Sequence, residues 1–286
     1  MRLVTFRANQ ADRVGVIRDD EVVEVAGLPN MLALISAGDD GLGAARVALE
    51  SRDARTHPLD AVGLLAPVPH PSGNVIAIGR NYQAHAEESA RAAGRPVDPP
   101  TIFTKAATSV TGPYADIPVD SSVTTKVDWE VELGVVVGRA GANIAQERAL
   151  DHVFGYFVVN DVSARDIQFG WGGQFFKGKS LDGFCPCGPW IVTRDEVEDP
   201  QSLRLLLRVN GETKQDSNTS DMIYPVEVIL EWVSKGMTLP AGTLIATGTP
   251  DGVGFARTPP EFLQSGDVME AEVEGIGTLR NRIVIA

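Results

Sequence analysis

The chain has 286 residues, and its 38 Asp and Glu against 25 Lys and Arg give a formal charge of −13 at pH 7. So acidic a chain is a poor partner for nucleic acid or an anionic membrane surface. Its 43% hydrophobic and 22% charged residues are typical of an ordinary globular protein, and 29 Gly with 18 Pro argue against a bundle of long helices. No stretch approaches the roughly 20 apolar residues of a membrane span.

The two cysteines, Cys185 and Cys187, are too few for a disulfide framework or an all-cysteine zinc site. They flank Pro186, so we expect small buried residues in a turn, with a redox pair as the alternative. The first residues lack the apolar core of a secretory signal. Together these features predict a cytoplasmic protein.

Residues 1–69 are predicted to form a small α/β domain. An apolar strand at residues 3–6 precedes a hairpin over residues 13–25 that turns at Asp19 and Asp20. Asn30 is placed to cap a short helix that Gly38 ends. Four prolines between residues 58 and 71 interrupt any long helix or central strand. This segment therefore reads as a linker with one short strand, and we expect a domain boundary near residue 70.

Residues 70–286 are predicted to form mostly short strands. Apolar runs bounded by Gly, Pro or polar residues recur between residues 74 and 285. The clearest helical patterns lie at residues 81–93, closed by Gly94, and at residues 224–234, followed by Gly236. The larger domain is therefore predicted to be a β-rich α+β body with long loops.

Acidic and apolar side chains alternate over residues 127–133, which predicts a strand with Asp128, Glu130 and Glu132 on one face. Residues two apart on a strand lie about 6.5 to 7 Å apart, so Glu130 and Glu132 can converge on one ion. The simpler interpretation is a solvated strand face. A further carboxylate, Asp161, follows the apolar run of residues 153–159 and would lie at the rim of a sheet. Two Glu and one Asp suit a hard cation, Mg²⁺ or Mn²⁺.

Residues 173–180, GQFFKGKS, match the phosphate-loop pattern GxxxxGK[ST]. That loop binds phosphate only between a buried strand and a helix. The sequence before it is too rich in Gly for a central strand, and Gly183 and Pro186 prevent a long helix after it. We therefore expect no nucleotide site here, although Lys179 remains a candidate cation in a loop flanked by Gly.

Seven segments together resemble the fumarylacetoacetate hydrolase family. They cover nearly everything after residue 70, and several ordered motifs are more specific than any single pattern. The segments are GRNY at 79–82 with His85, DWEVELGVVVG at 128–138, NDVSARDIQ at 160–168, GKSLDGFCPCGP at 178–189, QDSNTSDMI at 215–223, ATGTPDGVG at 246–254 and GDVMEAEVEGIGTLRN at 266–281.

The resemblance implies a catalytic domain built as a mixed β-sandwich roll over residues 70–286, usually assembled as a homodimer. It implies a divalent metal, Mg²⁺ or Mn²⁺, at an ExE…D triad that falls on Glu130, Glu132 and Asp161. Members of the family cleave, decarboxylate, hydrate or isomerise 2-oxo acids through a metal-bound enolate. The partner expected from the resemblance is thus a small 2-oxo acid.

His85 and Glu88 stand three residues apart in the predicted helix, so their side chains share a face and can meet. In this geometry Glu88 fixes the imidazole tautomer while His85 draws a proton from water. In the resembling acylpyruvate hydrolases the pair lies on a lid, and Gly94 with the proline-rich segment after it would suit a hinge. An ordinary exposed helix face is the simpler interpretation.

Three further residues are expected to meet the charge of an anionic substrate. Lys179 and Arg165 are the cations in the matching motifs, and Gln168 could donate to the oxyanion or hold a water molecule. Arg165 has an alternative role as an ion-pair partner of Asp166 or Asp161.

Gly248 and Thr249 follow an apolar strand. The backbone N–H and the hydroxyl could bind the substrate carboxylate, and a plain turn is the alternative.

The function expected from these features is metal-dependent hydrolysis of a carbon–carbon bond in a 2,4-dioxo acid, such as an acylpyruvate or a fumarylpyruvate-like compound. The same residues permit oxaloacetate decarboxylation and the isomerisation or hydration of a 2-hydroxymuconate-type acid. Two other classes stay open: a nucleotide-binding enzyme that uses residues 173–180, and a metal-binding scaffold without turnover.

Overall fold

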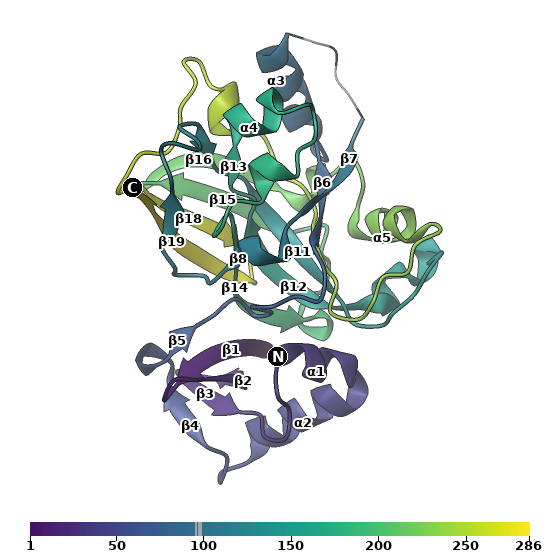
Figure 1. Ribbon diagram of the computed structural model, residues 1–286. Helices are drawn as coiled ribbons and strands as arrows, with labels where there is room; N and C mark the ends of the chain where they lie inside the picture. Colours follow the sequence, from purple (N-terminus) through teal and green to yellow (C-terminus); the bar gives the residue numbers. More distant parts are fainter. Residues whose placement is uncertain (95, 97–98) are drawn as a thin grey trace.

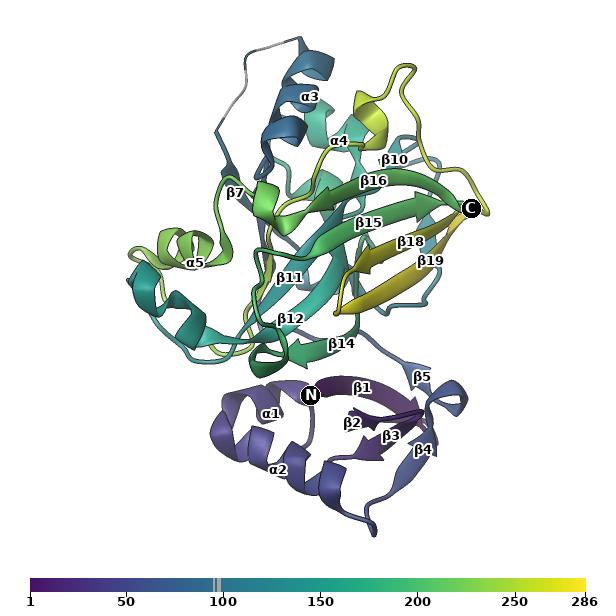
Figure 2. The same cartoon turned by 180° about the vertical axis from the view of Figure 1, so that it is seen from behind.

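The structure is a computed structural model that describes residues 1–94, 96 and 99–286. It is rich in strands, which form mixed sheets with few helices, so the predicted β-rich α+β class is confirmed. Figures 1 and 2 show a small N-terminal layer beneath a larger body that carries two sheets. No helix of the described residues is long and apolar enough to cross a membrane.

The N-terminal part contains five strands and two helices. They are β1 (Arg2–Ala8), β2 (Ala11–Arg18), β3 (Glu21–Glu24), α1 (Met31–Ser36), α2 (Asp39–Glu50), β4 (Thr56–Pro58) and β5 (Gly63–Leu64). The predicted hairpin joins β2 to β3, with Asp19 at a positive φ of 52° in the turn. Asn30 caps α1 as expected, because its Oδ1 accepts a hydrogen bond of 2.9 Å from the Ala33 amide.

Helix α2 was not predicted, because two glycines interrupt its helical pattern. Gly41 has a packing role instead. A Cβ atom at this position would lie 2.1 Å from the carbonyl oxygen of Leu34, so only glycine lets α2 approach α1 this closely. The propensity cost of a glycine in a helix is thus offset by tertiary contact.

A 12-stranded mixed sheet runs through both parts of the molecule, in the order β4-β3-β2-β1-β14-β12-β11-β17-β6-β7, with β5 on β1 and β8 on β14. Strand β1 pairs with β14, so the N-terminal strands continue the sheet of the larger body. A domain boundary near residue 70 stays a prediction. The remaining strands are β6 (Val75–Gly79), β7 (Thr101–Lys105), β8 (Val110–Thr111), β11 (Val131–Val137), β12 (Val153–Asn160), β14 (Cys185–Thr193) and β17 (Leu244–Ala246).

A second sheet of five strands packs on the central strands of the first (Figure 2). Its order is β16-β15-β18-β19-β9, and a separate pair joins β10 to β13. These strands are β9 (Ile117–Val119), β10 (Val127–Asp128), β13 (Ser163–Ala164), β15 (Arg204–Val209), β16 (Glu212–Asn218), β18 (Val268–Val273) and β19 (Gly277–Ile285).

Strands β11 and β12 are buried along their whole length. The apolar run of β12 predicts this burial, whereas the acidic alternation at the start of β11 predicts only one buried face. The two strands pair antiparallel with Val131 opposite Asn160, so the beginning of β11 meets the end of β12. This register places Glu130 and Glu132, at the start of β11, next to Asp161, which follows β12. The topology of two central strands therefore creates the site described below.

Three helices flank the sheets of the larger body: α3 (Gln83–Ala93), α4 (Arg165–Gly170) and α5 (Val226–Ser234). Helix α3 begins two residues later than predicted, because the Asn81 side chain is bound elsewhere. Its Nδ2 donates to the carbonyls of Thr247 and Tyr224, and its Oδ1 accepts from the Tyr224 amide. Gly94 ends the helix in the left-handed conformation, as expected.

Among the residues that the structure describes, seven short 3₁₀ segments complete the secondary structure. They are Leu59–Ala61, Ala107–Ser109, Gln146–His152, Lys177–Lys179, Arg194–Glu196, Thr219–Asp221 and Gly254–Ala256. The prediction that Cys185 and Cys187 lie in a turn is wrong, because both belong to β14. They are buried, as expected, with their sulfur atoms 3.8 Å apart.

Candidate active site

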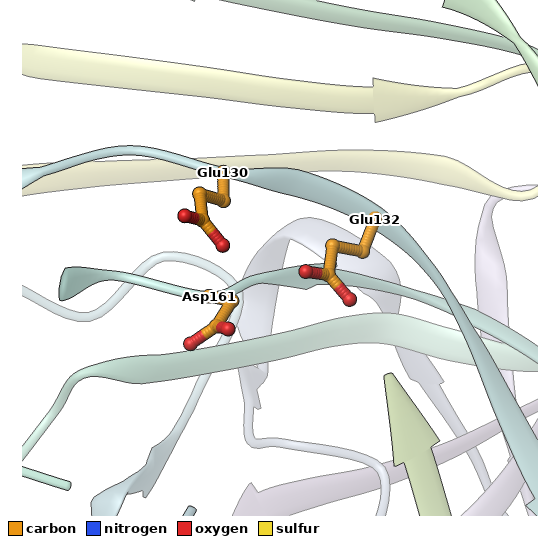
Figure 3. Close-up of side chains that lie close together, drawn as sticks. All are labelled: Glu130, Glu132 and Asp161. Atoms are coloured by element: carbon orange, nitrogen blue, oxygen red, sulfur yellow. The ribbon is translucent and has the colours of Figure 1, made fainter. Parts of the chain in front are cut away.

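The predicted carboxylate triad comes together in the structure. Figure 3 shows Glu130 just before β11, Glu132 on β11 and Asp161 just after β12, with their carboxylates gathered at one place. Ligand atoms of all three lie within 4.8 Å of one another, and each residue is at most 4% exposed. A solvated strand face is therefore excluded. A buried set of three carboxylates is the donor set that Mg²⁺ and Mn²⁺ prefer.

Asp128 does not join the triad, although the alternation placed it on the same face. Its Oδ1 accepts a hydrogen bond of 2.7 Å from the Gly254 amide, and its Oδ2 accepts one of 3.0 Å from the Phe255 amide and one of 2.8 Å from Arg165 Nε. The strand is interrupted after Asp128, since β10 ends there and β11 begins at Val131. Asp128 thus holds the loop around residue 254 and orients Arg165.

Three buried cations surround the carboxylates. Lys179 Nζ lies 2.7 Å from Glu130 Oε2 and 2.8 Å from Asp161 Oδ2. Arg165 Nη2 lies 2.6 Å from Glu130 Oε1, so the predicted ion-pair alternatives Asp161 and Asp166 are wrong for Arg165. The third cation, Lys105, ends β7 and contacts Asp161 Oδ1 and the Val162 carbonyl.

Burial disfavours the charged form of every carboxylate here, and neighbouring charges decide which of them stays ionised. At Glu130, burial is outweighed by Lys179 and Arg165, so its pKa falls to about 2. At Glu132, burial acts together with the negative charges of Asp161 and Glu130 and raises the pKa well above its usual range. The negative charge of Glu132 is therefore less well compensated by neighbouring cations than that of Glu130. A divalent cation held by the triad would compensate it.

Residues 173–180 do not have the structure of a phosphate loop. Helix α4 precedes them, the 3₁₀ segment Lys177–Lys179 lies within them, and β14 is the next strand. Lys179 is paired with two carboxylates. Gly178 serves close packing, since a Cβ atom there would lie 2.6 Å from the amide nitrogen of Gln168. The sequence-based rejection of a nucleotide loop therefore agrees with the local structure.

His85 and Glu88 meet on α3, as their spacing predicts. His85 Nδ1 lies 2.9 Å from Glu88 Oε1, and both oxygens of Glu88 accept from the Gly252 amide at 3.1 Å. Gly252 has a φ of +96°, and a Cβ atom there would lie 2.1 Å from the Lys214 carbonyl oxygen, so the turn requires glycine. His85 is 5% exposed, which excludes an ordinary exposed helix face.

Gly248 and Thr249 have partners other than those predicted. The Gly248 amide donates to Glu132 Oε2 at 2.7 Å, so this N–H supports a candidate metal ligand. The Thr249 hydroxyl donates to the Val131 carbonyl at 2.9 Å and accepts from Gln215 Nε2 at 2.8 Å. These contacts are more than those of a plain turn, and Thr249 also lines the cavity described next. Binding of a substrate carboxylate by these two groups stays a prediction.

One cavity gathers side chains from segments that lie far apart in the sequence. Its polar wall contains His85, Glu130, Arg165, Gln168, Lys179 and Thr249. Its apolar wall contains Ile78, Phe103, Phe169, Phe175 and Phe255. Gln168 Oε1 accepts from Arg165 Nη1 at 2.9 Å. This contact fixes the amide so that its NH₂ group is the one left for a ligand.

Lys105, Asp128 and Gln215 were not predicted as site residues, although each is fully buried at the site. Gln215 accepts from the Val131 amide and donates to Thr249, which ties β16 to the start of β11. A signal existed for Lys105, because it alternates with Phe103 and so shares the inward face of that strand. Gln215 carries no comparable local signal, since only tertiary structure brings β16 to β11.

A family model described as "Fumarylacetoacetate (FAA) hydrolase C-terminal" matches residues 74–284. The chain belongs to the fumarylacetoacetate hydrolase family. It is 43% identical over 289 residues to the oxaloacetate tautomerase YisK of Bacillus subtilis, covering 94% of this chain and 95% of the relative.

Solved structures in this family share the fold over the whole chain. A fumarylacetoacetate hydrolase from Exiguobacterium antarcticum is 40% identical, with a TM-score of 0.86 and full coverage of both chains. A maleylpyruvate hydrolase from Sphingobium sp. SYK-6, solved with a manganese(II) ion and pyruvate, is 31% identical, with a TM-score of 0.82 and full coverage of both chains. The protein is therefore an enzyme of this family, whose members include tautomerases, isomerases and hydrolases.

We predict that Lys105→Met lowers the free energy of unfolding of the metal-free protein by about 3 kcal/mol, because Asp161 would lose a buried partner. Urea denaturation in EDTA measures this change. The control is Lys235→Met, which removes an exposed pair with Glu231 at 3.4 Å and should cost less than about 0.5 kcal/mol. Equal free energies of unfolding for the two variants would mean that Lys105 does not stabilise the buried carboxylates.

Proposed function

We propose that this enzyme interconverts the keto and enol forms of oxaloacetate or a closely similar 2-oxo acid. The observation that carries the proposal is a single cavity in which His85, oriented by Glu88, faces Glu130 of the triad. Tautomerisation requires one proton to leave or reach C3 and negative charge to be stabilised on O2, and it needs no attacking water. The tautomerase activity named for the Bacillus subtilis relative supports this choice.

Glu130, Glu132 and Asp161 would hold the divalent ion. When bound, such an ion acts as a Lewis acid toward the oxygens of a 2-oxo acid and stabilises the charge of its enolate. Mg²⁺ and Mn²⁺ both suit the oxygen ligands, and the manganese-containing relative supports Mn²⁺.

In this proposal His85 transfers the proton at C3. Glu88 accepts from Nδ1 and so leaves Nε2 as the basic nitrogen of the neutral ring. Glu88 is itself held at both oxygens by Gly252, which fixes the direction of the imidazole relative to α3. In the keto-to-enol direction Nε2 takes the proton from C3 and the imidazolium delivers it to O2, and in the enol-to-keto direction the ring carries the O2 proton back to C3.

Lys179, Arg165 and Gln168 would stabilise the anionic substrate. Lys179 and Arg165 already touch Glu130, so their positive charges lie at the edge of the metal site. The NH₂ group of Gln168 faces the same cavity and can donate to a substrate oxygen. These groups are preorganised by their carboxylate partners, so little reorganisation is needed when charge develops on the substrate.

We predict that His85→Ala lowers kcat for enol-oxaloacetate conversion at least about 100-fold, because general acid–base catalysis contributes about 10²- to 10⁴-fold. The loss of enol absorbance, corrected for the spontaneous rate, measures it in protein reloaded with Mn²⁺ after EDTA. His70 is exposed and does not line the cavity, so His70→Ala serves as the matched control and should keep full activity. Undiminished activity of His85→Ala would rule out the proposed role.

Hydrolysis of a 2,4-dioxo acid is the second candidate. Two observations favour it: the apolar wall of phenylalanines suits an acyl group, and the same His85–Glu88 pair can activate water. The name of the Sphingobium relative supports it as well. Decarboxylation of oxaloacetate uses the same charge stabilisation without a water molecule.

We predict that acetylpyruvate releases pyruvate more slowly than the enzyme tautomerises oxaloacetate, because acyl transfer needs a positioned water in addition to the base. Coupled pyruvate detection, with both substrates at equal concentration, compares the two rates. Faster release from acetylpyruvate would make the protein a hydrolase. Pyruvate and carbon dioxide from oxaloacetate at the tautomerisation rate would make it a decarboxylase.

A further inference from the structure

The two ring nitrogens of His85 have different partners, and Ser89, the partner of Nε2, is not among the residues that act in the proposed tautomerisation. Nδ1 lies 2.9 Å from Glu88 Oε1, whereas Nε2 lies 3.4 Å from the hydroxyl oxygen of Ser89. His85, Glu88 and Ser89 stand at i, i+3 and i+4 of α3, so all three side chains share one face of the helix. Ser89 also lines the cavity that contains His85 and Glu130.

The contacts determine which nitrogen carries the proton. The Gly252 amide donates to both oxygens of Glu88, as it would to a carboxylate, which only accepts. Nδ1 must therefore be the donor toward Glu88. In the neutral ring Nε2 is then the acceptor, and the Ser89 hydroxyl is the group that can donate to it.

We propose that Ser89 is a positioning residue that keeps Nε2 of His85 directed into the cavity in both protonation states of the ring. This inference rests on the proposed function, in which Nε2 carries a proton between C3 and O2. A hydroxyl donates to the neutral Nε2 and, after rotation about its C–O bond, accepts from the protonated Nε2–H. The ring therefore keeps one orientation through the reaction.

The length of the contact fits this role. A separation of 3.4 Å is long for an O–H···N bond, so Ser89 orients the ring and leaves Nε2 available to a substrate carbon. Catalytic hydrogen bonds are often this loose before substrate binds. A serine within a helix commonly bonds the carbonyl four residues before it, whereas this hydroxyl faces the imidazole.

Substitution of Ser89 by alanine tests the contact without destabilising the helix. Alanine is a better helix former than serine, so Ser89→Ala is not expected to unfold α3. Threonine keeps a hydroxyl at the same position and is the conservative variant. Ser220, which is exposed in the 3₁₀ segment Thr219–Asp221, provides the control substitution Ser220→Ala.

The kinetic experiment uses the full chain loaded with Mn²⁺ and enol-oxaloacetate as substrate. Ser89→Ala should lower kcat about tenfold with KM unchanged within a factor of about two, as removal of one net hydrogen bond to a catalytic group would. Ser89→Thr should recover most of the loss, and Ser220→Ala should behave like the unchanged protein. A kcat for Ser89→Ala within twofold of the unchanged protein would overturn the proposal.

A double-mutant cycle separates positioning from a general structural role. Because Ser89 acts through the imidazole, Ser89→Ala should have almost no further effect when His85 is already alanine. A further tenfold loss in the His85→Ala background would show that Ser89 acts independently of His85. That result would contradict the inference even if the single variant were slow.

A spectroscopic readout does not depend on activity. The chain has four histidines, so ¹⁵N-histidine labelling with long-range ¹H–¹⁵N correlation resolves the His85 ring, assigned by its loss in His85→Ala. At mildly alkaline pH the protonated nitrogen should be Nδ1, and Ser89→Ala should move the Nε2 resonance toward that of a free imine nitrogen. Protonation at Nε2 in the unchanged protein would overturn the proposal. Absence of all turnover on oxaloacetate would refute the proposed function, whereas the ring spectrum would still decide the Ser89 contact.

Discussion

The charge balance around a buried carboxylate triad is the constraint on which the site depends. Glu130, Glu132 and Asp161 lie within 4.8 Å of one another and almost out of contact with water. Three carboxylates so placed repel one another and lose their hydration, which is costly unless cations compensate. Lys105, Arg165 and Lys179 provide three buried positive charges. A bound divalent ion would add the positive charge that these three residues do not place next to Glu132.

The fold brings these charges together through the pairing of two strands. The start of β11 meets the end of β12 in the 12-stranded sheet, which places two glutamates beside an aspartate. Loops then connect the other site residues to this pair of strands. The loop at residues 248–255 donates its amides to Glu132, Glu88 and Asp128, so one segment supports a metal ligand, the base pair on α3 and the anchor of Arg165.

Sequence reasoning reached the fold class and the triad because both depend on local patterns. Alternation around Glu130 and the apolar run before Asp161 identify strand ends, and the spacing of His85 and Glu88 identifies a helix face. The interruption of the strand after Asp128 was not predictable, because Gly254 and Phe255, whose amides bind this carboxylate, lie more than 120 residues away. The roles of Gly248 and Lys105 likewise depend on pairings that no local pattern records. The family resemblance implied the same metal site and added the class of substrate, a 2-oxo acid.

The most direct test of this account is anomalous diffraction from crystals of the protein soaked in Mn²⁺. The account predicts one strong manganese peak bonded to carboxylate oxygens of Glu130, Glu132 and Asp161. The same soak of Glu132→Gln crystals should give a much weaker peak, because one anionic ligand is lost. A triad without manganese, with Lys179 still bridging Glu130 and Asp161, would contradict the central claim that these carboxylates form the metal site.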